Sequence, residues 1–315
     1  MAFRSGFVSI LGRPNAGKST LLNALAGQKL AIVSPKPQTT RHRVLGIIHT
    51  PRRASRPAAQ AILIDTPGVH RPESSLGRKM MAEVREALEG CDLVLAIVDA
   101  ARKSQPADRY LLSLVESSKA SAFLLLNKID LLGREKQELL PFIEHYRNQY
   151  DFQEIIPISA RTKEGLDLLT EKLIAALPHG PRYFADDQIT DQPTRFMAAE
   201  LIREQVLLRI REEVPHYVTV VVDEFEEGAK LTRIAATIYC EREGQKPILI
   251  GRQGQMLKAI GTAARQEIER MLGAKVFLEL FVKVRPNWRD SRAFIEELDW
   301  RRQLEHLLTR SSAKN

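Results

Sequence analysis

Residues 7–25 read FVSILGRPNAGKSTLLNAL, in which one apolar run passes through a loop with two glycines into a second apolar run. The loop matches the pattern GxxxxGK[ST], and its members, with the residue that follows, are Gly12, Arg13, Pro14, Asn15, Ala16, Gly17, Lys18, Ser19 and Thr20. Between a strand and a helix, such a loop directs successive backbone N–H groups at phosphate oxygens. There Lys18 reaches the β- and γ-phosphates and the Ser19 hydroxyl binds Mg²⁺. Taken alone, the loop has the alternative of a glycine-rich turn.

Apolar, β-rich runs recur beyond this loop and alternate with segments of helical periodicity. The runs are residues 6–11, 61–64, 93–98, 122–126 and 155–158. The helical segments include residues 76–88, 139–150 and 165–177. This alternation predicts an α/β domain with a mostly parallel sheet and helices on both faces. Because ligands of such sheets bind at the carboxyl ends of the strands, the loops after these runs are the expected site.

A DxxG motif follows the run at 61–64 and consists of Asp65, Thr66, Pro67 and Gly68. Its place after a strand predicts that Asp65 holds Mg²⁺, through a water molecule, and that the Gly68 N–H senses a γ-phosphate. An isolated DxxG would indicate no more than a turn.

The motif after the run at 122–126 concerns the base and consists of Asn127, Lys128, Ile129 and Asp130. The Asp130 carboxylate is expected to accept from the ring N–H and the exocyclic amine of guanine, two donors that adenine does not offer in that arrangement. Adenine would leave a buried carboxylate unpaired, and a site with this demand discriminates by about 10⁴ or more. GTP or GDP is therefore the predicted ligand. Ser159 and Ala160, after the last run, are placed for a backbone N–H to bond the guanine oxygen.

These motifs, in this order, resemble those of the translation-factor-related GTPases. The resemblance implies that residues 38–41 belong to a mobile switch segment with a magnesium-binding threonine, which we assign to Thr40 rather than Thr39 from its position before Arg41. The alternative is a solvated threonine pair in a loop. The catalytic group then consists of Lys18, Asn15, Thr40 and Gly68, with Ser19, Thr40 and Asp65 as the metal-binding residues.

The residue that follows Gly68 is Val69, which has no polar group to orient an attacking water. Asn15 matches a subgroup of GTPases in which this asparagine helps to hold K⁺ beside the β- and γ-phosphates. We therefore hypothesise potassium-stimulated hydrolysis. The alternative is that Asn15 only stabilises the loop.

The second half of the chain has a different order of elements. Residues 178–193 are rich in Pro, Gly and Asp and lack periodicity, which indicates a linker. Helical patterns follow at residues 194–213 and 256–272 and from Asp290 onward. Strand patterns lie at residues 217–225, 233–241 and 275–284. This order predicts a smaller α+β domain.

A GxxG loop, Gly251-Arg252-Gln253-Gly254, opens the helix at 256–272, and Lys258 lies in its first turns. These five residues are the candidate RNA-binding residues, because a KH domain clamps single-stranded nucleic acid with such a loop. Nine basic and three acidic residues lie between 246 and 289, against three basic and eight acidic between 212 and 243. A basic face beside an acidic one would orient RNA along the GxxG side. The alternative is a mixed-charge solvated surface.

From residue 5 to about 308 the chain resembles the Era family of bacterial GTPases. The resemblance rests on GRPNAGKST, PQTTRHR, DTPGVHRP, NKID, GPRYFADDQITDQ, EEVPHY and LIGRQGQMLKAIG. It implies a GTPase domain at 1–178, a linker at 179–193 and a type II KH domain with a C-terminal helix at 194–315. It also implies binding of the 3′ end of 16S rRNA and a role in assembly of the 30S ribosomal subunit. Two alternatives stay open: a constitutive RNA-binding assembly chaperone with a slow structural GTPase module, and a ribosome-associated GTPase with another RNA target.

The bulk properties are consistent with this organisation. A chain of 315 residues has room for two domains, and its net charge of +8 permits a polyanionic partner without requiring one. Its two cysteines lie far apart, and we expect neither a leader nor a membrane-spanning run from the sequence. We expect a cytoplasmic monomer, and the family resemblance leaves a peripheral location at the inner membrane open. The basic segment 51–60 is expected to be a hairpin tip, although Arg52, Arg53 and Arg56 could contact rRNA.

Overall fold

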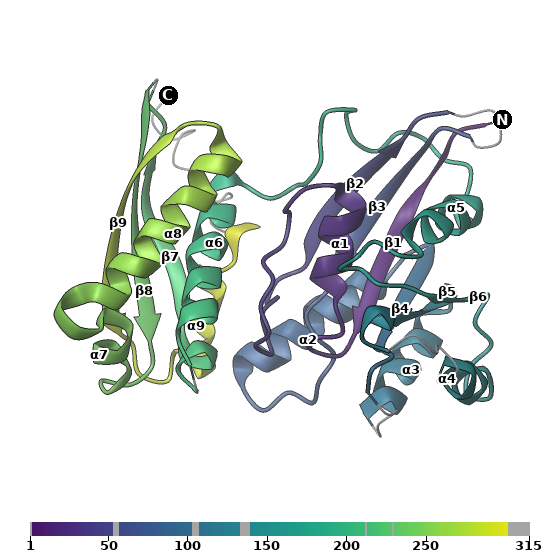
Figure 1. The fold of residues 1–315 in the computed structure, drawn as a ribbon, viewed down its shortest axis with the longest axis horizontal. Coiled ribbons are helices and arrows are strands. Elements are labelled where there is room, and N and C mark those ends of the chain that lie inside the picture. The colour runs from purple at the N-terminus through teal and green to yellow at the C-terminus, as the bar shows by residue number, and fades with distance from the viewer. Residues whose placement is uncertain are drawn as a thin grey trace. The chain divides into compact units, whose positions relative to one another are not determined.

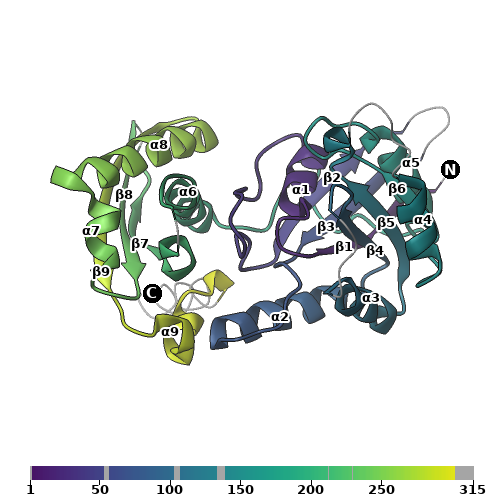
Figure 2. The same cartoon turned by 60° about the horizontal axis from the view of Figure 1, so that its bottom comes forward.

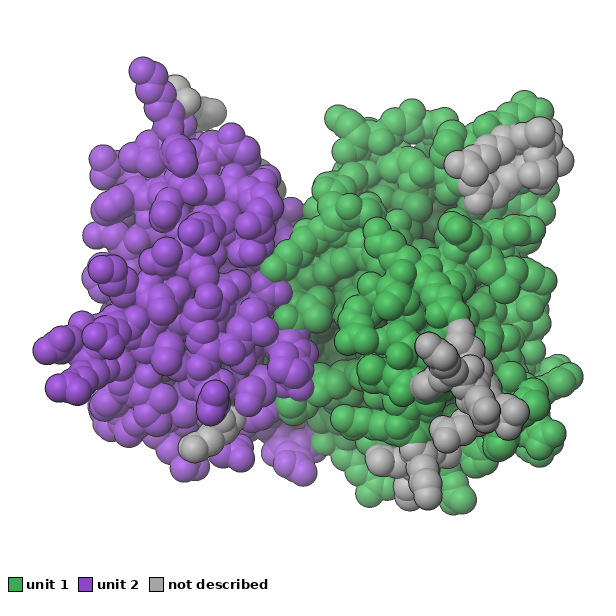
Figure 3. Space-filling model, viewed as in Figure 1, with its two compact units in different colours: residues 1–33, 37–71, 79–191 green, residues 34–36, 72–78, 192–315 purple. Residues whose placement is uncertain are grey.

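A computed structural model of the protein describes residues 2–52, 57–102, 107–132, 139–211, 213–228 and 230–301. Figures 1 and 2 show the helices and strands of the chain from two directions. The chain divides into two compact units, which consist of residues 1–33, 37–71 and 79–191 and of residues 34–36, 72–78 and 192–315 (Figure 3). The domain bounds proposed from the sequence, with a linker at 179–193, stay a prediction. Within the described ranges, none of the helices combines the length and the apolar character that a bilayer crossing requires.

The first unit is built on a six-stranded sheet of order β2-β3-β1-β4-β5-β6. Its strands are β1 (Arg4–Gly12), β2 (Val44–Thr50), β3 (Ala59–Asp65), β4 (Leu93–Asp99), β5 (Ser121–Asn127) and β6 (Glu154–Pro157). Only β2 pairs antiparallel, with β3, and Thr50 lies opposite Ala59. The other pairs are parallel, so the five apolar runs of the sequence correspond to parallel strands. The segment 51–58 joins the two strands of a hairpin, and its residues 53–56, which include Arg53 and Arg56, lie outside the described residues.

Two apolar cores lie on opposite faces of this sheet. The helices are α1 (Lys18–Ala26), α2 (Ser75–Leu88), α3 (Ala107–Ser118), α4 (Leu139–Arg147) and α5 (Leu166–Ala176). One core contains Leu21 of α1 and Leu169 of α5 with alternate residues of the strands, such as Ile10. The other contains residues of α2, α3 and α4, such as Val84 and Val115. Figures 1 and 2 accordingly show α1 and α5 on one side of the sheet and α2 and α3 on the other. Successive residues of a strand point to opposite faces, so a continuously buried strand such as β4 places apolar side chains in both cores, and each face is covered by helices.

The segment predicted to be a linker makes hydrogen bonds to the sheet. Strand β2 forms an edge of the sheet, and the Ile47 N–H donates to the carbonyl of Ile189 at 2.9 Å. The Gln60 side chain is fully buried, accepts from the Tyr183 N–H at 2.8 Å and donates to the Phe184 carbonyl at 2.9 Å. The Ile47 bond occupies a backbone group of the edge strand and the Gln60 bonds hold the same segment to β3, so residues 181–190 act as a strap along this edge of the sheet.

The second unit has a three-stranded sheet of order β7-β8-β9. Its elements are α6 (Thr194–Arg209), β7 (Thr219–Glu226), β8 (Leu231–Cys240), α7 (Gln245–Ile250), α8 (Gln255–Leu272), β9 (Lys275–Val284) and α9 (Arg292–Glu297). Strands β7 and β8 are antiparallel and β8 and β9 are parallel, so the predicted α+β order is confirmed. The apolar run before the GxxG loop forms the short helix α7. The final helix, expected from Asp290, begins at Arg292, and residues beyond 301 lie outside the described ranges.

Candidate functional site

The loop from Gly12 to Ser19 connects β1 to α1 and wraps closely on itself. Gly17 has φ of 102°, and a Cβ at this position would collide with the Asn127 side chain, so only glycine fits. The Lys18 ammonium is buried and donates to the carbonyls of Gly12 and Arg13, each at 3.1 Å. Lys18 therefore lies against the inside of the loop, as a residue that binds phosphate must.

The three residues expected to bind metal come together at the start of α1. The Ser19 Oγ donates to Asp65 Oδ2 at 2.6 Å and lies 2.8 Å from the Thr40 hydroxyl, which is 3.4 Å from the same carboxylate oxygen. The other oxygen, Asp65 Oδ1, is buried and has no hydrogen-bond partner among the described residues. An oxygen set of this kind, with one carboxylate atom unsatisfied, fits Mg²⁺, which keeps water and phosphate ligands beside one or two protein groups.

No group of three or more His, Cys, Asp and Glu side chains that could hold a metal occurs in the part of the chain that the structure describes. A metal at Asp65 therefore depends on phosphate and hydroxyl oxygens as well, which is the usual arrangement for magnesium at a nucleotide.

Electrostatics at this place favour ligands of both signs. Burial lowers the pKa of Lys18 to about 8, although the charge of Asp65 acts in the opposite direction. Burial also raises the pKa of Asp65 to about 6, against the effects of Lys18 and of hydrogen bonds from Ser19 and Thr40. A bound phosphate favours the ammonium and a bound cation favours the carboxylate. Burial thus disfavours the charged form of both side chains. A phosphate beside Lys18 and a cation beside Asp65 would favour the charged forms again.

The DxxG segment lies directly against the phosphate loop. A Cβ at Gly68 would lie 2.7 Å from Pro14 Cγ, so the close approach requires glycine. The Val69 N–H donates to the Gly12 carbonyl at 3.0 Å, and the Thr66 hydroxyl donates to the Ile10 carbonyl at 2.8 Å. Both bonds hold residues 65–69 in place, and Pro67 is buried between them. The structure therefore brings Gly68 beside the loop, while its role at a γ-phosphate stays a prediction.

The residues expected at the base meet where β5 and β6 end. Asn127 joins this region to the phosphate loop, because its amide donates to the Ala16 carbonyl at 2.7 Å and accepts from the Ala160 N–H at 2.9 Å. The Asp130 carboxylate accepts from the Ser159 hydroxyl at 2.6 Å. Ala160 is thus the predicted base contact whose N–H already has a protein acceptor. Asn127 therefore connects the phosphate loop to the loop that contains Ala160.

Two residues near the base were not anticipated. Asp99 ends β4 and receives the Lys128 ammonium at 2.7 Å, and Arg161 forms an ion pair with Asp130. The rule that ligands bind at the carboxyl ends of parallel strands could have identified Asp99. Burial alone would raise the pKa of Asp130, but the hydrogen bond from Ser159 and the charge of Arg161 outweigh it, so this pKa lies below its usual value. Asp130 is therefore kept ionised as an acceptor.

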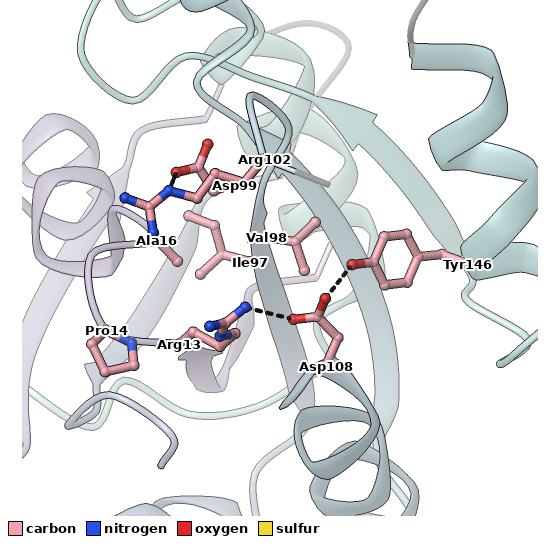
Figure 4. Close-up of a pocket in the computed structure, with 9 residues that line it drawn as sticks. All are labelled: Arg13, Pro14, Ala16, Ile97, Val98, Asp99, Arg102, Asp108 and Tyr146. Atoms are coloured by element: carbon pink, nitrogen blue, oxygen red, sulfur yellow. Dashed lines mark hydrogen bonds and ion pairs between the residues drawn. The ribbon is translucent and has the colours of Figure 1, made fainter. Parts of the chain in front are cut away.

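A small pocket lies against the phosphate loop and shares residues with it. It is lined by Arg13, Pro14, Ala16, Ile97, Val98, Asp99, Arg102, Asp108 and Tyr146 (Figure 4). There Arg13 lies 3.7 Å from Asp108, whose carboxylate also accepts from the Tyr146 hydroxyl at 3.2 Å. The Arg13 side chain thus contacts Asp108, while its carbonyl accepts from Lys18.

The GxxG loop joins α7 to α8 in the second unit. Gly251 has φ of 73°, and a Cβ there would lie 2.6 Å from the Met256 Cβ, so the turn requires glycine. Gly254 and Gln253 also have positive φ, of 77° and 51°. The side chains of Arg252, Gln253 and Lys258 are exposed. The structure therefore presents an open, basic loop at the start of a long helix.

Comparison with known proteins gives matches for both parts of the chain. Residues 7–128 match the family model described as a 50S ribosome-binding GTPase, and residues 213–289 match the KH domain model. GTPase Era of Geobacter metallireducens is 49% identical over 300 residues, which cover 95% of this chain and 98% of the relative. GTPase Era of Ruminiclostridium cellulolyticum is 47% identical over 302 residues, which cover 96% and 99% of the two chains.

Solved structures give the same result. The crystal structure of Era in complex with MgGDPNP and nucleotides 1506–1542 of 16S ribosomal RNA has a TM-score of 0.89 at 40% identity, covering 93% of this chain and 98% of that one. A variant of Aquifex aeolicus Era bound to GDP and aluminium fluoride has a TM-score of 0.88 at 40% identity, with the same coverage of 93% and 98%. The chain belongs to the Era family of GTPases.

Proposed function

We propose that this GTPase is a switch that binds the 3′ end of 16S rRNA and acts in assembly of the 30S ribosomal subunit. The observation that carries the proposal is the meeting of Ser19, Thr40 and Asp65 oxygens beside Lys18, because it joins a switch-segment threonine to the expected metal and phosphate position. The open GxxG loop and the RNA bound by the similar Era structure support the RNA assignment. A γ-phosphate would order the Thr40 segment, and hydrolysis would release it.

The residues have separate roles in this proposal. Backbone N–H groups of the loop and Lys18 bind the phosphates, and Ser19, Thr40 and Asp65 bind Mg²⁺. Bound Mg²⁺ neutralises charge on the β- and γ-phosphates. Asp130 selects guanine, and Gly68 senses the γ-phosphate. In the second unit, Arg252 and Lys258 contact the RNA backbone.

Hydrolysis needs a group that orients the attacking water, and Val69 is buried and apolar. Asn15 lies in the phosphate loop with φ of 63°, a conformation that asparagine tolerates better than most residues. We infer that Asn15 helps to hold K⁺ beside the phosphates, where its charge would act in the transition state. Turnover measured in potassium and sodium chloride at equal ionic strength tests this, and equal rates would remove K⁺ from the mechanism.

The proposal extends to the domains and the location of the protein. Residues 1–178 would form the GTPase domain, 179–193 the connection and 194–315 the RNA-binding domain. We infer a cytoplasmic monomer, and the family resemblance leaves a peripheral location at the inner membrane open.

The central test is the affinity for an RNA of the 16S 3′-end sequence, measured with GDPNP, with GDP and without nucleotide. A switch requires that the affinities differ between these states, because a ligand shifts an equilibrium only through differential binding. Equal affinities would favour the constitutive assembly chaperone instead. Crosslinking to total RNA, with identification of the bound fragment, separates 16S rRNA from another RNA target.

A pair of charge reversals assigns the RNA to the GxxG loop. Arg252→Glu with Lys258→Glu should weaken RNA binding at physiological salt and lower the slope of log affinity against log salt by about 2. Arg270→Glu is the control. Arg270 lies on helix α8, as Lys258 does, about 18 Å from Lys258 along the helix axis. If the control weakens binding as much as the pair does, the loop is not the contact.

A further inference from the structure

Three basic residues, Arg41, His42 and Arg43, directly follow Thr40, and two of them converge on one carboxylate of helix α2. The Arg43 N–H donates to Glu83 Oε2 at 3.3 Å, and its guanidinium Nε lies 3.8 Å from the same oxygen. The His42 Nδ1 lies 3.9 Å from Glu83 Oε1. One side chain therefore contacts both the backbone and the side chains of the segment that begins β2.

The surroundings of Glu83 make this arrangement unusual. Helix α2 is described over its whole length, and Glu83 is the one charged residue among its buried positions, which otherwise include Met80, Met81, Val84 and Leu88. Only 5% of its side chain is exposed. Removing a carboxylate from water is unfavourable, and well-packed apolar residues often serve stability as well as a buried ion pair does. Stability alone is thus a weak reason for a glutamate at this position.

The two segments that Glu83 joins both lead to the phosphate end of the site. Thr40 is three residues before Arg43 and contacts Ser19 and Asp65 through its hydroxyl. Helix α2 follows the DxxG segment, in which Gly68 lies against the phosphate loop. We propose that Glu83 is a positioning residue that couples the Thr40 segment to helix α2, so that both respond together to a γ-phosphate. This rests on the roles proposed above for Thr40 and Gly68.

The coupling has a specific consequence for nucleotide selection. In the proposed function GDP is held by the phosphate loop and by the base-binding residues, whereas the Glu83 contacts described above go to His42 and Arg43, in the segment that follows Thr40. A γ-phosphate additionally requires Thr40 and Gly68 in place at the same time. Loss of the link should therefore weaken binding of a GTP analogue and leave GDP binding unchanged. A general packing defect would weaken both.

The test compares Glu83→Gln and Glu83→Met, which remove the charge at similar volume, with wild-type protein. Dissociation constants for GDPNP and GDP are measured on the full-length protein by titration with fluorescent analogues of both. We expect the GDPNP value to rise at least about fivefold, the low end of ordinary coupling between sites, and the GDP value to change by less than about twofold. Hydrogen exchange of residues 37–43 with GDPNP bound should also become faster.

Glu86→Gln is the matched control, because Glu86 lies 3.8 Å from the same Arg43 but its side chain is 56% exposed. We expect its affinities for both nucleotides to equal those of the wild type. The inference is overturned if the Glu83 variants keep the wild-type ratio of the two dissociation constants, or if they weaken both by one factor.

Thr40→Ala separates this inference from the function on which it rests. A loss of GDPNP affinity in Thr40→Ala together with a wild-type ratio in Glu83→Gln would reject only the coupling. A wild-type ratio in both variants would reject the role of Thr40 and the coupling together. If the ratio of the GDPNP and GDP dissociation constants changes in Glu83→Gln but not in Thr40→Ala, the effect of Glu83 does not act through Thr40, and the proposed coupling is rejected.

Discussion

Replacing Asp130 by asparagine changes one oxygen of the base site into an NH₂ group and leaves the shape of the side chain almost the same. In the protein itself, the change affects the hydrogen bond from Ser159 at 2.6 Å and the ion pair with Arg161. The Arg161 side chain is 70% exposed, and such pairs contribute only about 0.2–1 kcal/mol. We therefore expect Asp130→Asn to fold with nearly wild-type stability.

The effect on guanine binding should be much larger. The carboxylate would accept from two N–H groups of guanine, and hydrogen bonds to charged groups contribute about 1.5–3 kcal/mol each. Asparagine keeps one acceptor and presents a donor to the other N–H, so the net loss is about 3–5 kcal/mol. At 1.4 kcal/mol for each factor of ten, GDP affinity should fall about 10²- to 10⁴-fold. Xanthine carries a carbonyl oxygen in place of the exocyclic amine, and the new NH₂ group can donate to it.

The assay is calorimetric or fluorescence titration of wild type and Asp130→Asn with GDP, XDP and ADP at saturating Mg²⁺. We expect the variant to lose GDP binding and to gain XDP binding, with ADP weak in both proteins. Asp167→Asn, an exposed aspartate on α5, serves as a control for the loss of one negative charge. If the variant binds GDP within about threefold of the wild type, Asp130 does not recognise the base and our assignment of the site is wrong.

Three further predictions use other parts of the same site. Because ionised Asp130 accepts from guanine and its pKa is lowered by Ser159 and Arg161 despite burial, GDP affinity should persist above that pKa and be lost as pH falls through it. GDP titrations from pH 7 to about pH 4 should show this loss at higher pH in Arg161→Gln, and identical curves would contradict the role of Arg161. Asn15→Ala should remove any excess of turnover in potassium over sodium, and persistence of that excess would exclude Asn15 as its source. Gly17→Ala should destabilise the protein by about 1–3 kcal/mol through its φ of 102° and abolish GDP binding, as thermal unfolding and titration would show; unchanged binding would mean that the loop adapts.

The sheet and the place of the nucleotide site were predictable because each depends on a local signal. The parallel strands are buried on both faces, so they appear as unbroken apolar runs such as residues 93–98 of β4. Their carboxyl ends then bring Gly12, Asp65 and Asn127 to one edge without further information. Lys275–Val284 was equally clear, because its inward and outward residues alternate.

Other features depend on contacts between distant residues, and the sequence carries little sign of them. The ion pair between Arg161 and Asp130 and the bond between Lys128 and Asp99 join separate loops. Helix α7 has only six residues, too few for a periodic pattern, and Ile248 within it is exposed. Helix α3, which buries Leu111 and Val115, was not among the helices predicted from the sequence. Periodicity identifies an element from the spacing of its own apolar residues. It carries no information on contacts with distant residues.

The strap at residues 181–190 shows what composition cannot predict about a linker. Its Pro, Gly and Asp content and its lack of periodicity predict a linker and carry no sign of its hydrogen-bond partners. Yet buried backbone groups must find partners, and the partners here belong to the sheet edge: the Thr190 hydroxyl donates to the Leu45 carbonyl at 2.7 Å, and the Ile47 N–H donates to Ile189 at 2.9 Å. Strand β2 begins only four residues after Thr40. A shift of β2 along its axis must therefore either move the strap as well or break these hydrogen bonds. Strand β2 thus connects the strap, through which the chain leaves the first unit, to the Thr40 segment at the phosphate site.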